Sequence, residues 1–156
     1  MRHAGIPLGV IRGLGIDHCE VERVARTLER FGERFLRRVF TEEEVRYCLR
    51  FSSPAERLAA RFAAKEATAK ALGTGLSHGV GWKMIEVRRE KGKEPRLYLS
   101  GRAAVIACER GIMRWHLAIT HAGGLATAIV IGEGGWNSGS EREPAAKSEE
   151  EPTAGS

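Results

Sequence analysis

The pattern of hydrophobic and polar positions in the first half of the chain predicts a buried strand followed by short helices. Residues 8–16 mix Val, Ile and Leu with glycines, which is typical of a buried strand. Residues 20–40 carry apolar side chains at near-helical spacing with arginines on the remaining faces, and we expect Gly32 to divide this stretch into two helices. Thr41 followed by Glu44 forms a capping-box pattern, which predicts the start of a third short helix.

The second half of the pattern predicts one long helix and several strands. Ser53-Pro54 is a typical helix start, and Gly73 is a typical helix stop, so a long helix should lie between them. The pattern then predicts strands over 82–89 and 95–100, a helix over 101–110, and strands over 114–120 and 125–131. Strands at both ends with helices between them predict an α+β fold with a mainly antiparallel sheet and a long central helix.

Composition divides the chain into a basic domain and an acidic tail. Its 156 residues with 42% hydrophobic side chains fit one soluble domain, which we place at residues 9–133 after an N-terminal extension of residues 1–8. Residues 134–156 are rich in Gly, Ser, Glu, Pro and Ala, and we expect them to be disordered. Residues 132–156 carry a net charge of −4, so residues 1–131 carry +9, which indicates a polyanionic partner: phosphates, nucleic acid or an acidic protein.

The sequence also predicts a cytoplasmic protein. No apolar run approaches the ~20 residues that a membrane span needs, and the short apolar stretch near the N-terminus contains Pro7 and Gly9, which is unlike a signal peptide. Cys19, Cys48 and Cys108 are odd in number and widely spaced, as reduced thiols are. The chain has no Cys-x-x-Cys and no zinc-type ligand spacing.

Two carboxylates and a lysine are the strongest candidates for chemistry. Asp17 follows the predicted first strand, and Glu66 lies in the long helix with Lys70 one turn later. Magnesium prefers oxygen ligands and usually takes one or two carboxylates together with substrate phosphates, so Asp17 and Glu66 would suit it. The same residues also fit an ordinary reading, in which Glu66 and Lys70 form a surface ion pair and Asp17 caps the following helix. Spacing alone leaves both readings open.

A basic stripe and a glycine loop add candidates on the same helix. Arg57, Arg61 and Lys65 recur every four residues near the Gly73-Thr74-Gly75 loop. Such a stripe is more often a solvated face, and such a loop is more often a helix stop with a turn. No Gly-Lys-Ser/Thr follows, so the loop is not a Walker A motif. His121, between a strand and a glycine turn, is by position more often a packing residue than a functional one.

Over roughly residues 9–133, the chain resembles the 4′-phosphopantetheinyl transferases of the holo-acyl-carrier-protein synthase type. The resemblance rests on two motifs, which are Gly13-Leu14-Gly15-Ile16-Asp17 and Arg61-Phe62-Ala63-Ala64-Lys65-Glu66-Ala67, the second continuing to Lys70 and Gly73-Thr74-Gly75. Two shorter matches are Phe40-Thr41-Glu42-Glu43-Glu44 and Ala118-Ile119-Thr120-His121. His18-Cys19 departs from the family, because two aliphatic residues are expected after the aspartate.

The resemblance implies that the chain transfers the phosphopantetheine arm of coenzyme A to a serine of an apo carrier protein and releases adenosine 3′,5′-bisphosphate. It implies Asp17, Glu66 and Lys70 as catalytic residues, with Asp17 and Glu66 holding Mg²⁺ and Lys70 stabilising charge on the phosphate. The residues implied in binding coenzyme A are Arg61, Lys65, Gly73, Thr74, Gly75, Thr120 and His121. The base for the serine is either Glu66 or a water on the metal.

The resemblance also implies partners. The carrier is an acidic protein of fatty acid or polyketide synthesis, and Arg23, Arg26 and Arg30 should receive its acidic helix. The short members of the family form homotrimers with active sites between subunits. We expect no nucleic-acid partner, because the basic helices lack interleaved exposed aromatics. We also expect no membrane partner, because no apolar run is long enough to span one. The competing hypotheses are a non-catalytic coenzyme A or carrier-binding module and a basic nucleic-acid-binding domain.

Overall fold

The computed structural model describes residues 9–136 and confirms the α+β fold with antiparallel sheets. Three strands form the larger sheet in the order β1-β5-β4, and two form a separate hairpin. The strands are β1 (Gly9–Glu20), β2 (Ile85–Arg88), β3 (Arg96–Leu99), β4 (Arg114–Ala122) and β5 (Leu125–Gly135). All neighbouring strands are antiparallel, as the sequence predicts.

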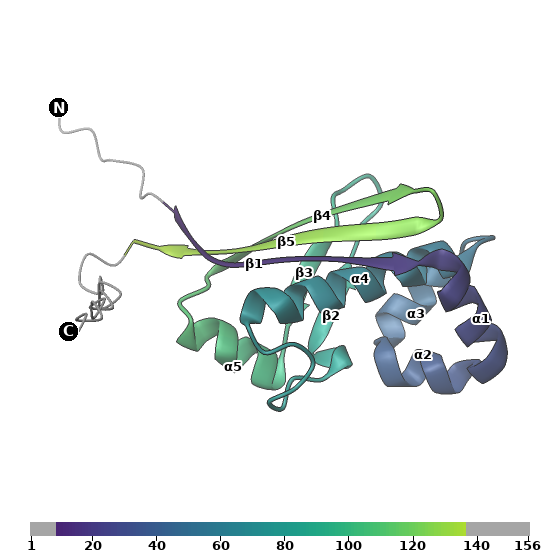
Figure 1. The fold of residues 1–156 in the computed structure, drawn as a ribbon, viewed down its shortest axis with the longest axis horizontal. Coiled ribbons are helices and arrows are strands. Elements are labelled where there is room, and N and C mark those ends of the chain that lie inside the picture. The colour runs from purple at the N-terminus through teal and green to yellow at the C-terminus, as the bar shows by residue number, and fades with distance from the viewer. Residues whose placement is uncertain (1–8, 137–156) are drawn as a thin grey trace, which may run out of the picture.

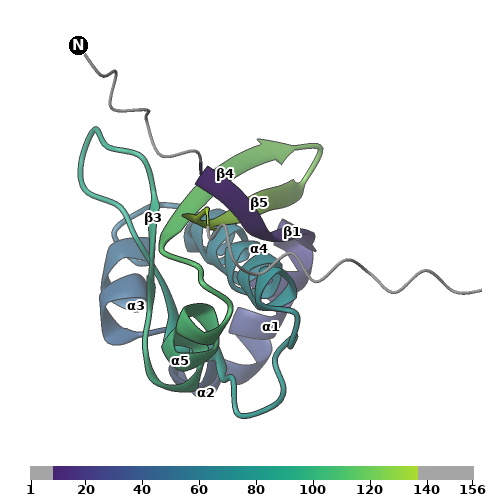
Figure 2. The same cartoon turned by 90° about the vertical axis from the view of Figure 1, so that its left-hand side faces the viewer.

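Residues 9–136 also form five α-helices, and the longest of them lies at the centre of the fold. They are α1 (Val21–Phe31), α2 (Glu33–Val39), α3 (Glu42–Cys48), α4 (Pro54–Leu72) and α5 (Gly101–Glu109). Figure 1 shows α1, α2 and α3 gathered at one end of α4 and α5 at the other. Figure 2 shows the sheet of β1, β5 and β4 curving over one side of α4 with α5 on the opposite side. The helix α4 therefore forms the centre of the core, with residues such as Leu58, Ala63, Ala67 and Leu72 buried.

The local signals in the sequence mostly hold. Gly32, with φ of 50°, separates α1 from α2, and Thr41 and Glu44 form the predicted capping box of α3. The strand predicted over 82–89 is partly wrong, because Trp82–Met84 forms a short 3-10 helix before β2 begins. The first strand continues to Glu20 because β5 pairs with it throughout that stretch, so Asp17 lies within β1 and does not cap α1.

Two glycines let β1 lie directly against α4. A Cβ built on Gly15 would lie 2.8 Å from the carbonyl carbon of Ala67, and one on Gly13 would lie 3.1 Å from that of Ala71. Any larger residue at these positions would push the strand away from the helix. The glycines of the first motif and the alanines of the second are therefore packing partners. This contact brings the ends of the two motifs, Asp17 and Glu66, to one place.

The end of β5 bears on the predicted limits of the domain, which stay a prediction. The strand β5 runs to Gly135, two residues beyond the expected boundary at 133. The predicted extension, residues 1–8, and residues 137–156 of the predicted acidic tail lie outside the described residues. Within residues 9–136, no helix is long and apolar enough to cross a membrane. The three cysteines are free thiols.

Candidate active site

Asp17 and Glu66 form a pair of interacting carboxyls. Burial and the neighbouring Asp17 carboxylate together raise the pKa of Glu66 to about 7. Burial alone would raise the pKa of Asp17, but the neighbouring Glu66 carboxyl and the hydrogen bond from Lys70 outweigh it and lower that pKa below its usual value. Near neutral pH, the pair therefore holds a proton that a divalent cation would displace.

The pair fits a magnesium ion. Oδ2 of Asp17 is buried and has no hydrogen-bond partner among the described residues, as expected of an atom that awaits a ligand. The described residues contain no group of three or more His, Cys, Asp and Glu side chains that could hold a metal. Magnesium does not need such a group, because it binds through one or two carboxylates and completes its shell with water and phosphate oxygens.

Lys70 reaches from α4 across to β1. Its Nζ lies 2.8 Å from Oδ1 of Asp17 and donates a second hydrogen bond, of 3.1 Å, to the carbonyl of Ile16. The ion pair that Lys70 makes is therefore with Asp17, and the ordinary reading of a Glu66–Lys70 pair along the helix is wrong. The Lys70 side chain is 54% exposed. It is held at the carboxyl pair and is open to solvent.

The Gly73–Gly75 loop closes the C-terminus of α4. Gly73 and Gly75 have φ of 76° and 59°, a region that favours glycine. The N–H of Gly73 donates to the carbonyl of Lys70 (2.9 Å), and those of Thr74 and Gly75 donate to the carbonyl of Ala69 (3.3 and 3.1 Å). These three amides already cap the helix. The glycines therefore leave room for a ligand beside the loop, but the amides do not offer it free donors.

Lys65 is not part of an exposed basic stripe, and that expectation was wrong. The Lys65 side chain is fully buried and forms an ion pair of 2.7 Å with Glu44 on α3. Its Nζ also donates to the carbonyls of Trp82 (3.0 Å) and Ile85 (2.5 Å). The helix α4 is enclosed on this side, so three basic residues spaced four apart did not imply a solvated face. The structure thus removes Lys65 from the residues that can contact coenzyme A.

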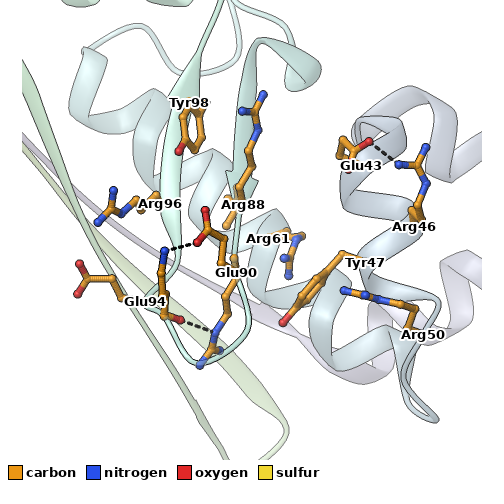
Figure 3. A pocket seen from close by; sticks show the side chains of 13 residues that line it. Glu43, Arg46, Tyr47, Arg50, Arg61, Arg88, Glu90, Glu94, Arg96 and Tyr98 are labelled. Carbon is orange, nitrogen blue, oxygen red and sulfur yellow. Dashed lines mark hydrogen bonds and ion pairs between the residues drawn. The ribbon is translucent and has the colours of Figure 1, made fainter.

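Arg61 lies in a basic cavity that the sequence reasoning missed. The cavity has a volume of about 320 Å³ and lies between α3, α4 and the β2–β3 hairpin (Figure 3). We call it the arginine pocket; its basic lining residues are Arg46, Arg50, Arg61, Arg88, Arg89, Lys93 and Arg96, against the acidic Glu43, Glu90 and Glu94. Arg61 is nearly buried, with its guanidinium 4.2 Å from the centroid of the Tyr47 ring. The signal for this pocket in the sequence is the basic run of residues 88–96.

Thr120 and His121 lie elsewhere in the same chain. Both are exposed at the end of β4, which is separated from β1 by β5. Strands in a sheet are about 4.8 Å apart, so β4 lies about 10 Å from the strand of Asp17. Neither residue lines the arginine pocket. One chain therefore does not bring Thr120 and His121 together with Arg61 or with the carboxyl pair.

Arg23, Arg26 and Arg30 are exposed on α1, as the sequence predicts. Arg26 forms an exposed ion pair of 3.2 Å with Glu22 on the same helix. The guanidinium of Arg30 lies 5.1 Å from the centroid of the Phe31 ring, which is itself half-exposed. The surface is thus basic with one apolar side chain.

Comparison with known proteins identifies the family. Residues 13–130 match the model of the 4′-phosphopantetheinyl transferase superfamily. The chain belongs to this superfamily. It is 48% identical over 122 residues to the holo-[acyl-carrier-protein] synthase of Koribacter versatilis, covering 78% of this chain and 98% of that protein. It is also 48% identical over 126 residues to the synthase of Halothermothrix orenii, covering 81% and 100%.

Solved structures of superfamily members share the fold. The holo-[acyl-carrier-protein] synthase of Neisseria meningitidis matches with a TM-score of 0.71 at 33% identity, covering 79% of this chain and 98% of that one. The synthase of Bacillus anthracis, in complex with CoA (3′,5′-ADP), matches with a TM-score of 0.65 at 35% identity, covering 80% and 97%. The predicted fold and enzyme class, a phosphopantetheinyl transferase, are therefore confirmed.

Proposed function

We propose that the chain is a holo-acyl-carrier-protein synthase. It transfers the 4′-phosphopantetheine arm of coenzyme A to a serine hydroxyl of an apo acyl carrier protein and releases adenosine 3′,5′-bisphosphate. The observation that carries the proposal is the Asp17–Glu66 carboxyl pair with Lys70 beside it, in a chain of the phosphopantetheinyl transferase superfamily. The names of its relatives and the coenzyme A in the Bacillus anthracis structure support the substrates.

Asp17 and Glu66 would hold the magnesium ion. Oδ2 of Asp17, which lacks a donor, and the carboxyl of Glu66 supply the protein oxygens. When bound, the metal neutralises charge on the pyrophosphate of coenzyme A. Because the pKa of Glu66 is raised to about 7, the pair must lose its proton to bind the ion. Binding should therefore strengthen as pH rises to neutrality.

Lys70 would stabilise the transition state. Its exposed ammonium can turn from Asp17 to the phosphate oxygen that bridges to the leaving group. Negative charge develops at that oxygen when the bond to it breaks. A cation already held at that place stabilises the developing charge with little reorganisation.

The nucleotide end would bind in the arginine pocket. Seven cations against three carboxylates suit the 3′-phosphate, and Arg61 is the most deeply placed of them. None of the residues lining this pocket belongs to the carboxyl pair or the Gly73–Gly75 loop. We infer that one coenzyme A spans two subunits, with the pyrophosphate on one chain and the nucleotide on its neighbour, where Thr120 and His121 could also contribute.

An exposed apolar surface on the sheet supports a homotrimer with sites between subunits. Ile11, Leu14 and Ile16 on β1 are 65%, 61% and 58% exposed, and Ile129, which pairs with Ile16, is 40% exposed. A contiguous apolar patch of this kind marks an interaction site. Asp17 lies on the same strand, so burying this patch between copies would bring a neighbouring chain close to the carboxyl pair.

The acidic carrier would dock on α1. Arg23, Arg26 and Arg30 present positive charge on this helix. Electrostatic complementarity raises the association rate and selects partners more than it raises affinity, so the docking should weaken with salt. We place the reaction in the cytoplasm, in keeping with three free thiols.

The function is tested by the mass of a carrier protein. The chain is incubated with coenzyme A, Mg²⁺ and a carrier protein verified as apo. We expect the carrier to gain one phosphopantetheine, an equal amount of adenosine 3′,5′-bisphosphate to appear, and both to stop with a chelator. An unchanged mass for several apo carriers would rule the function out.

The shared site is tested by mixing two inactive variants. Glu66→Gln removes a proposed metal ligand, and Arg61→Gln removes the proposed nucleotide contact. If sites lie between subunits, unfolding and refolding the two together yields some interfaces in which both parts are intact, and activity returns. If each chain holds a whole site, the mixture stays inactive.

A further inference from the structure

Arg110 lies directly on the Gly73–Gly75 loop. It follows the last residue of α5, and its guanidinium covers the Cα of Gly73. A Cβ built on Gly73 would lie 2.8 Å from Cζ and 2.9 Å from Nη1 of Arg110. Glycine at this position therefore gives the C-terminal cap of α4 its left-handed conformation and also leaves the space that the guanidinium occupies.

The loop itself is poorly suited to an anion. The three amides of Gly73, Thr74 and Gly75 donate to carbonyls at the end of α4. Phosphates usually bind at helix N-termini, where free N–H groups and the positive end of the helix dipole meet. This loop lies at a C-terminus, where the dipole is negative. A phosphate beside Lys70 therefore needs cationic side chains to offset that end of the helix.

Arg110 can supply the missing charge. Its side chain is exposed, and within residues 9–136 it makes no ion pair and no side-chain hydrogen bond. Lys70, whose carbonyl accepts the N–H of Gly73, is partly engaged by Asp17. Arg102, on α5, is by contrast paired with Glu109 of the same helix at 3.7 Å. Arg110 is thus an uncommitted guanidinium at Gly73, three residues along the chain from Lys70.

We propose that Arg110 is a substrate-binding residue that contacts the pyrophosphate of coenzyme A at the Gly73–Gly75 loop. A planar guanidinium can donate two parallel hydrogen bonds to one phosphate, which also fixes the orientation of that group. Together with Lys70 it places two cations at the negative end of α4. This inference rests on the proposed function, because it assumes coenzyme A as the ligand.

The experiment compares two ligands on the parent and four variants of the full chain in Mg²⁺. Calorimetry gives Kd for coenzyme A and for 3′-dephospho-coenzyme A, which keeps the pyrophosphate and lacks the 3′-phosphate. Losing a hydrogen bond to a charged group at an exposed site weakens binding about tenfold, so Arg110→Gln should raise both Kd values by about that factor. Arg61→Gln should raise Kd only for coenzyme A. Arg110→Lys, which keeps the charge without the fork, should recover part of the loss.

Arg102→Gln is the matched control, because it removes an exposed arginine from α5, the helix that Arg110 follows, and should leave both Kd values unchanged. The thermal unfolding midpoint of Arg110→Gln should equal that of the parent chain. Parent-like affinity of Arg110→Gln for both ligands would overturn the inference, as would a loss confined to coenzyme A, which would place Arg110 at the 3′-phosphate. A parent chain that binds neither ligand would overturn the proposed function and this inference with it.

Discussion

Lys65 and Lys70 are five residues apart on α4, and each forms an ion pair with a carboxylate, but their surroundings are opposite. Lys65 and its partner Glu44 are both fully enclosed, while Lys70 is 54% exposed beside Asp17. Burial lowers the pKa of Lys65 against the pull of Glu44. The hydrogen bond that Lys70 donates to Asp17 instead raises the pKa of Lys70.

The hydrogen bonds of the two ammonium groups explain the difference. An ammonium has three donors. Lys65 uses all three, on Glu44 and on the carbonyls of Trp82 and Ile85. Lys70 uses two, on Asp17 and on the carbonyl of Ile16, which leaves one for a ligand. A fully satisfied buried pair holds α3, α4 and β2 together, whereas a half-exposed ammonium with one free donor can exchange partners during a reaction.

Removing Lys65 should have the largest effect. Lys65→Met leaves the carboxylate of Glu44 buried without its cation, which typically costs about 3–5 kcal/mol in the free energy of unfolding. Denaturant unfolding measures this loss. The double variant Glu44→Gln/Lys65→Met carries no buried charge and should regain much of it. If the double variant is as unstable as the single one, the charge of Glu44 is not the cause.

Removing Lys70 should affect catalysis and leave the fold intact. Lys70→Met takes away one group that stabilises the transition state, which typically lowers kcat about 10²- to 10³-fold. Lys70 is half-exposed, so the denaturant midpoint should fall much less than in Lys65→Met, although Asp17, which is only 12% exposed, loses its cation. Steady-state transfer kinetics and unfolding on the same preparation test both parts. Turnover at the parent rate would return Lys70 to the role of a surface residue.

The carboxyl pair should give the metal-free chain a characteristic pH dependence. Folding raises the pKa of Glu66 from 4.5 to about 7, so the folded state binds its proton more tightly than the unfolded state. Stability from this group is therefore present at low pH and is lost as pH rises from about 4.5 to about 7. Folding lowers the pKa of Asp17, so its contribution to stability has the opposite sign: it is present above pH 3.8 and is lost as pH falls below that value.

The measurement is the unfolding free energy against pH for the parent and for Glu66→Gln, both in a chelator. The difference between the two curves should change across that window and then level off. Mg²⁺ should reverse the trend, with proton release on binding near neutral pH. Two parallel curves would mean that Glu66 keeps an ordinary pKa.

The smallest effect on stability is expected for an exposed pair away from both lysines. Arg26→Gln breaks the pair with Glu22 on α1 and should change the free energy of unfolding by less than about 0.5 kcal/mol. It should lower the association rate with the carrier, and this loss should shrink at high salt. Stopped-flow binding at two salt concentrations tests it. An association rate equal to the parent's at low salt would remove Arg26 from the docking surface.

Local signals in the sequence predicted much of the fold. The capping box of Thr41 and Glu44, the break at Gly32 and the stop at Gly73 each act within a few residues, so they can be read in order along the chain. The same locality explains the errors. Nothing near Glu44 shows that its carboxylate also accepts the N–H of Val87 and neutralises Lys65, since both partners are distant in sequence.

The candidate site was predicted only in part for the same reason. The family motifs led to Asp17, Glu66 and Lys70, but the contact between Lys70 and Asp17 depends on how closely Gly13 and Gly15 let β1 approach α4. The arginine pocket joins residues from α3, α4 and the β2–β3 hairpin, and no single window of sequence contains them. Charge counts indicated a polyanionic ligand without indicating where it binds.

The central claim is that the Asp17–Glu66 pair, with Lys70, carries out phosphopantetheine transfer. It is tested most directly by the intact mass of an apo carrier protein after incubation with coenzyme A, Mg²⁺ and either the parent chain or Glu66→Gln. We predict that the parent adds one phosphopantetheine to the carrier and that Glu66→Gln adds none, although it folds as the parent does. Modification of the carrier by Glu66→Gln at the parent rate would contradict the account.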